Sequence, residues 1–86
     1  MQPVTSDDEL GRLLAAGVGF IYNDYPGTDK LGRPYRILHA AGCETLGVAI
    51  AERKYFAEDL NEAIAWLRRT RGEEGIGWRR CKECEP

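Results

Sequence analysis

The sequence predicts a single small α+β domain, with two helices and a small antiparallel sheet of three to four strands. Two capping sequences each predict the start of a helix, one near the beginning of the chain and one in its second half. Short runs rich in β-forming residues occupy the stretches between and after them, separated by short loops. With 86 residues, the chain has room for one domain spanning residues 1–86 and one small core.

The first helix is expected over residues 7–16, as an addition at the N-terminal side of the rest of the domain. Ser6 and Glu9 form a capping box, in which the serine accepts a backbone N–H and the glutamate reaches back. Leucines at helical spacing follow, and they give the helix one apolar side. Gly17 suits the left-handed residue that often follows a helix.

The remaining elements follow from β-rich runs and one further capping box. Strands are predicted at residues 18–25, 35–39, 46–51 and 76–80. The polar segment from Asn23 to Pro34, rich in glycine and proline, is expected to form a loop or hairpin tip that could bind a ligand. Asp59 begins the second capping box, and an apolar stripe at helical spacing then predicts a helix that ends near Gly72.

Composition places the chain among ordinary folded domains. Hydrophobic residues make up 43% and charged residues 30%, which argues against intrinsic disorder. The formal net charge of −2 is not that of a dedicated nucleic-acid binder. The longest mostly apolar stretch, residues 13–22, is shorter than the roughly 20 residues that span a bilayer, and no basic segment of a secretory signal precedes it. We therefore expect a complete small cytoplasmic protein.

The most informative pattern is His-x3-Cys followed later by Cys-x2-Cys. His39 and Cys43 form the first pair, and Cys81 and Cys84 form the second. These four residues are the only histidine and all three cysteines of the chain. One imidazole and three thiolates in two closely spaced pairs are typical of a closed tetrahedral Zn²⁺ site. The sequence thus predicts a structural zinc ion that ties the middle of the chain to its last residues.

Two other interpretations of these residues remain open. Cys81 and Cys84 could act as a thiol-redox pair, although such pairs usually sit at the start of a helix and only Glu85 and Pro86 follow here. The four residues could also be unrelated, with Cys43 a buried apolar thiol and the Cys-x2-Cys an incidental pair.

The segment from Tyr35 to Pro86 resembles small bacterial zinc modules with His-x3-Cys and Cys-x2-Cys pairs. It is also similar to the metal-binding domain of the bacterial Ada DNA-repair protein, in which a Cys-x3-Cys pair precedes a Cys-x2-Cys pair in a basic segment. Ada-type domains use their first cysteine as a methyl acceptor. His39 occupies that position here and cannot act as a sacrificial thiolate. The resemblance therefore implies zinc binding and does not extend to repair of phosphotriesters.

Basic and aromatic residues near the predicted helix end and the Cys-x2-Cys pair form a candidate contact surface. They are Arg68, Arg69, Arg71, Trp78, Arg79, Arg80 and Lys82. Arginines can contact phosphates and a tryptophan can stack on a base. Arginines in a last helical turn also complement the helix dipole, and a tryptophan often packs in the core. Nearby glutamates would cancel part of the positive field.

We therefore expect a non-enzymatic structural-zinc module that binds a macromolecular partner, either nucleic acid or protein, with no membrane association and no evident small-molecule substrate. Four protein ligands leave no open metal position for catalysis. A small metalloenzyme or thiol-redox protein that uses Cys81 and Cys84 is the first alternative. A protein-interaction or inhibitor fold, in which zinc is only a staple, is the second.

Overall fold

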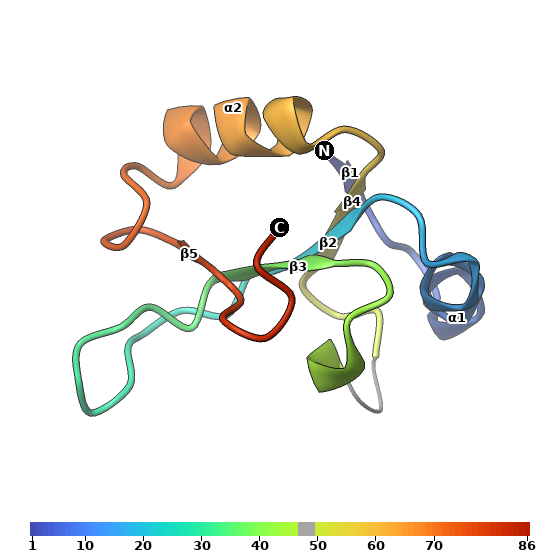
Figure 1. Ribbon diagram of the computed structural model, residues 1–86, viewed down its shortest axis with the longest axis horizontal. Helices are drawn as coiled ribbons and strands as arrows, with labels where there is room; N and C mark the ends of the chain where they lie inside the picture. The colour runs from blue at the N-terminus through green and yellow to red at the C-terminus, as the bar shows by residue number, and fades with distance from the viewer. Residues whose placement is uncertain (47–49) are drawn as a thin grey trace.

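The computed structural model describes residues 1–46 and 50–86, and it contains a five-stranded mixed sheet with two α-helices (Figure 1). The α+β class is therefore confirmed. The elements in chain order are β1 (Gln2–Pro3), α1 (Asp7–Ala16), β2 (Phe20–Asn23), β3 (Ile37–Ala40), the short 3₁₀ helix η1 (Glu44–Leu46), β4 (Lys54–Ala57), α2 (Leu60–Thr70) and β5 (Arg79–Arg80). Within the described residues, no helix has both the length and the apolar character needed to cross a membrane.

The helix starts were predicted correctly, because each is set by local capping. The α1 bounds agree with the prediction, with Ser6 Oγ accepting the Glu9 N–H at 3.1 Å. Gly17 follows in the left-handed region, at φ +67°. Asp59 caps α2 in the same way, and its carboxylate accepts the Glu62 N–H at 3.0 Å.

The sheet is not wholly antiparallel, which corrects the prediction. Its strand order is β1-β4-β2-β3-β5, and β3 and β5 run parallel while the other neighbours are antiparallel. Short loops led us to expect antiparallel neighbours throughout. However, β5 pairs with a strand far back in the chain, and the long connection through β4 and α2 permits a parallel pair.

The strand predicted at residues 46–51 was placed wrongly in the part that the structure describes. Leu46 ends η1 and Ala51 lies in a bend, while residues 47–49 fall outside the described residues. The strand that pairs with β2 on the side away from β3 is instead β4, where Lys54 lies opposite Asn23. The strand was not predicted because it begins with a charged residue, which usually lies on the surface. Lys54 is buried despite its charge, and it contacts the Tyr25 ring.

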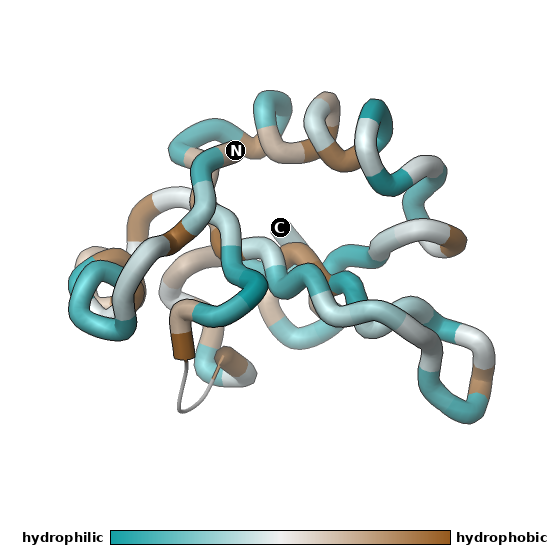
Figure 2. The backbone as a smooth tube through the Cα atoms, turned by 180° about the vertical axis from the view of Figure 1, so that it is seen from behind, coloured by the Kyte–Doolittle hydropathy of each residue, from teal (hydrophilic) through white to brown (hydrophobic). Residues whose placement is uncertain are grey.

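Alternate residues of the sheet pack into two separate hydrophobic clusters. One cluster lies between the sheet and α2, and its buried members are Tyr22, Leu38, Ala57, Ala63, Leu67 and Trp78. The other lies toward α1 and η1, with Val4, Leu10, Ile21, Ala41, Leu46 and Ala51. The hydrophobic segments of α2 lie mainly on the side that faces the rest of the chain (Figure 2). His39 alternates with Leu38, so it points away from α2, to the same face as its cross-strand neighbour Ile21.

Candidate metal centre

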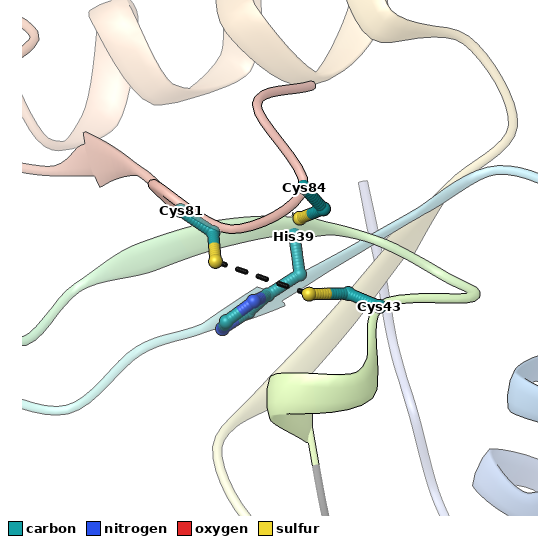
Figure 3. A group of neighbouring side chains, drawn as sticks. All are labelled: His39, Cys43, Cys81 and Cys84. Atoms are coloured by element: carbon teal, nitrogen blue, oxygen red, sulfur yellow. Dashed lines mark hydrogen bonds between the residues drawn. The ribbon is translucent and has the colours of Figure 1, made fainter.

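All four residues of the predicted metal set lie together in the folded chain. The candidate ligand atoms of His39, Cys43, Cys81 and Cys84 all lie within 4.8 Å of one another. They come from β3, the turn after β3 and the C-terminal segment, and their side chains converge (Figure 3). Residues separated by about half of the chain thus form one compact group of donors that could hold a metal ion.

The parallel pairing of β3 with β5 is what brings Cys81 to His39. Arg79 lies beside Ile37, and the Cys81 N–H then donates to the Leu38 carbonyl at 2.9 Å. Because side chains alternate along strands, Cys81 emerges on the same face as His39. An antiparallel β5 would run the chain past β3 in the opposite direction and carry the Cys-x2-Cys pair away from this end.

Two tight turns place the remaining thiols. The Cys43 N–H donates to the Ala40 carbonyl at 3.0 Å, which returns the chain toward His39. At the C-terminal end, the Glu85 N–H donates to the Cys81 carbonyl at 3.0 Å and closes a turn around Cys84. The Cys84 sulfur in turn accepts the Ala40 N–H at 3.3 Å. Backbone N–H donors of this kind orient metal-binding thiolates.

The distances fit a tetrahedral metal site better than a disulfide. Cys43 Sγ and Cys81 Sγ lie 3.9 Å apart. Two sulfurs bound to one Zn²⁺ at about 2.3 Å in tetrahedral geometry would be about 3.8 Å apart, whereas a disulfide bond is about 2.05 Å long. The widest ligand separations, up to 4.8 Å, would need side-chain adjustments of about 1 Å to close on an ion.

Thr45 borders the centre and was not predicted from the sequence. Its hydroxyl oxygen lies 2.9 Å from Cys43 Sγ, 3.4 Å from Cys81 Sγ and 3.4 Å from His39 Nδ1. The hydroxyl has one proton to donate, and a thiolate sulfur is a suitable acceptor. The spacing of Thr45 from Cys43 contained no motif that would have identified it.

The surroundings shift the pKa values of three of the four donors, in different directions. Burial, with the positive charges of Arg79 and Lys54, lowers the pKa of His39 to about 4, so the imidazole is neutral at neutral pH. Burial raises the pKa of Cys81, but hydrogen bonds from Thr45 and from two backbone N–H groups outweigh this effect and lower the pKa to about 7. Burial, together with the neighbouring thiols, raises the pKa of Cys84. Metal binding requires all three thiols to lose their protons, and a bound dication would offset the repulsion among the thiolates that result.

The chain matches no family model, no curated protein and no solved structure. The predicted resemblance to an Ada-like module is thus supported only at the level of the His/Cys cluster itself.

The predicted basic surface is divided by the fold. Trp78 is fully buried, and its indole N–H donates to the Gly72 carbonyl at 3.0 Å, so it cannot stack on a base. Arg71 pairs with Asp24 at 2.8 Å. Arg80 pairs with Glu74 at 3.1 Å. The structure thus uses these three residues internally, while Arg68 and Arg69 lie exposed at the end of α2.

Two hollows lie beside the centre and share their basic lining. One, of about 380 Å³, reaches His39 and Cys81, and the other, of about 570 Å³, lies further along β5. Arg33, Arg79 and Lys82 line both hollows. Arg33 comes from the loop between β2 and β3, and sequence analysis did not select it because nothing local links it to the Cys-x2-Cys pair.

Proposed function

We propose that this chain is a zinc-binding module in which one Zn²⁺ ion acts as a structural staple. The imidazole of His39 and the thiolates of Cys43, Cys81 and Cys84 would hold the ion. The single observation that carries this proposal is the convergence of all four donors within 4.8 Å. The site needs three reduced cysteines, which the reducing cytoplasm would supply.

The donor set favours zinc over other common metals. Three thiolates and one imidazole are too soft for Mg²⁺ or Ca²⁺, which prefer oxygen ligands. Four protein donors fill a tetrahedral Zn²⁺ shell and leave no water to activate, as in structural rather than catalytic sites. The role of zinc here would therefore be to cross-link β3 to the C-terminal segment, without taking part in catalysis.

Metal analysis of purified protein tests the staple. We expect one zinc per chain, and X-ray absorption should give one nitrogen and three sulfur ligands at roughly 2.0–2.3 Å. The Cys81→Ser variant should lose the zinc, while Lys82→Ser, a change next to it in the same turn, should retain it. A three-ligand site with bound water would instead support a metalloenzyme. A reversible Cys81–Cys84 disulfide in metal-free protein would support a thiol-redox role.

A second part of the proposal is a macromolecular partner that docks beside the metal centre. The observation that favours it is the pair of adjoining hollows with Arg33, Arg79 and Lys82 in their lining. Acidic groups, including Glu74 and Glu83, also line these hollows and reduce the positive field. A partner that presents only a few phosphates or carboxylates fits this balance better than a long nucleic-acid backbone.

Retention on immobilised DNA and RNA separates the two kinds of partner. Binding to phosphates should weaken steeply with salt, and it should fall in Lys82→Ala but not in Lys30→Ala, a lysine in the exposed loop after β2. If the protein is not retained at about 50 mM salt, nucleic acid is excluded as the partner. The remaining candidate is then a protein-interaction fold with zinc as its staple.

A further inference from the structure

We propose that Asn23 is the residue that orients His39 at the metal centre, with its side-chain carbonyl accepting the Nε2–H so that Nδ1 is the metal ligand. This inference rests on the proposed zinc site. It adds to the site a residue that does not bind the ion, and it defines the tautomer of His39. It concerns a positioning residue, since Asn23 would touch His39 and not the ion.

The sheet places Asn23 against the outer side of the imidazole. In the antiparallel β2–β3 pair, Ile21 lies opposite His39, and Asn23 lies opposite Ile37. Asn23 is two residues from Ile21, so its side chain projects to the same face as His39 and reaches it diagonally. The Asn23 amide nitrogen Nδ2 lies 3.2 Å from His39 Nε2.

A metal ion on Nδ1 leaves the proton of the neutral imidazole on Nε2, so this side of the ring needs an acceptor. As placed, Oδ1 of Asn23 is buried and has no hydrogen-bond partner within residues 1–46 and 50–86. The oxygen and nitrogen of an amide have nearly the same shape, and their assignment rests on the hydrogen-bond network. Exchanging them puts Oδ1 next to Nε2, where it can accept the ring N–H. The exchange pairs this oxygen with the ring N–H, places the amide nitrogen where the oxygen was, and leaves the shape of the side chain unchanged.

The other ring nitrogen faces the thiols. Nδ1 of His39 lies 3.4 Å from the Thr45 hydroxyl, which itself contacts Cys43 Sγ and Cys81 Sγ. The imidazole thus lies between Asn23 on its Nε2 side and the sulfur atoms on its Nδ1 side, and Figure 3 shows the ring beside the sulfurs of Cys43 and Cys81. With the proton held on Nε2, where it is donated to the Asn23 carbonyl oxygen, the lone pair of Nδ1 is free for a metal.

This arrangement matches a general property of metal-binding histidines. The ring nitrogen that does not bind the metal usually donates its N–H to a carbonyl or carboxylate, which sets the tautomer and the ring orientation. Loss of such a partner typically lowers metal affinity by about 10- to 100-fold.

Nitrogen NMR of the unaltered zinc-loaded protein gives the first test. We expect the long-range proton–nitrogen spectrum of His39 to show Nε2 protonated and Nδ1 bound to the metal. A spectrum with Nδ1 protonated and Nε2 bound would overturn the inference while leaving the zinc proposal intact. Failure of the unaltered protein to bind zinc would instead overturn both.

Zinc affinity, measured by competition with a chelating dye, gives the second test. Asn23→Leu should weaken binding by about 10- to 100-fold, whereas Asn23→Asp, which keeps an acceptor oxygen, should restore most of it. Asn61→Leu, an exposed asparagine on α2, is the matched control and should bind like the unaltered protein. Equal zinc affinity in Asn23→Leu and the unaltered protein would contradict a positioning role.

Discussion

Asp24 and Arg71 form a two-point ion pair that joins the end of β2 to the end of α2. Arg71 Nη2 lies 2.8 Å from Asp24 Oδ2, and its Nε lies 2.9 Å from Oδ1. The Asp24 carboxylate also accepts the Tyr22 hydroxyl at 2.7 Å and Arg36 Nε at 3.0 Å. Paired charges of this geometry are stronger than single contacts. The pair holds α2 over the sheet and removes Arg71 from the surface predicted to bind a partner.

Replacing Asp24 with asparagine should destabilise the protein by about 2 kcal/mol at neutral pH. The hydrogen bond from Arg71 outweighs burial and lowers the Asp24 pKa from 3.8 to about 2, and the side chain is 17% exposed. Chemical denaturation of Asp24→Asn and the unaltered protein, both loaded with zinc, measures the difference. Asp8→Asn, an exposed acid in the first turn of α1, should have a much smaller effect. An equal loss in both variants would contradict a special role for the pair.

The contribution of Asp24 to the free energy of unfolding should also depend on pH in a defined direction. The folded-state pKa lies below the unfolded value, so the stabilisation is present above about pH 3.8 and is lost as pH falls toward 2. The difference in unfolding free energy between the unaltered protein and Asp24→Asn should therefore be equal at pH 7 and pH 5. At lower pH, acid also releases zinc from the thiolates, so the comparison is made between pH 5 and pH 7. A difference that already declines between pH 7 and 5 would assign the effect to another group.

Removal of the metal should unfold most of the chain. Structural zinc in small domains contributes on the order of 10 kcal/mol, which is comparable to the whole stability of a domain. We expect prolonged chelation, or Cys81→Ser, to collapse the amide dispersion in the NMR spectrum, and added Zn²⁺ to restore it only in the unaltered protein. Unchanged dispersion after chelation would show that the two hydrophobic clusters suffice without a staple.

Gly77→Ala should be strongly destabilising, because the turn before β5 has no room for a side chain. A β-carbon there would collide with the Arg71 carbonyl oxygen, so the backbone must move. Such a shift would displace Trp78 and the strand β5 that precedes Cys81. Gly11→Ala is the matched control, because a β-carbon at Gly11 in α1 meets nothing within 4 Å. It should raise stability by about 0.5–1 kcal/mol. Thermal melts distinguish the two, and similar melting temperatures would refute the steric argument.

Trp78 should behave as a core residue and not as a binding platform. The chain has two tryptophans, so Trp66→Phe leaves Trp78 as the only one. Its emission should be blue-shifted and poorly quenched by acrylamide, because the side chain is fully buried. Added single-stranded DNA or RNA should not quench it. Strong quenching by an oligonucleotide would restore the stacking role.

The local elements could be predicted because local chemistry determines them. Ser6 and Asp59 each satisfy a free N–H at a helix start, and Gly17 takes the left-handed conformation that ends α1. The strand β4 could not be found in this way. The charge of Lys54 predicts a surface residue, but the folded sheet buries it beside Tyr25. Tertiary burial overrode the local pattern there.

By itself, the sequence determined the donor set, since one histidine and three cysteines in two short-spaced pairs leave few other uses for these residues. Only the tertiary structure decided how the pairs meet. The parallel register of β5 on β3 delivers Cys81 to His39, and the antiparallel register of β2 delivers Asn23 to its other side. Strand register depends on packing between segments far apart in the chain. The spacing of residues along the chain therefore does not predict strand register.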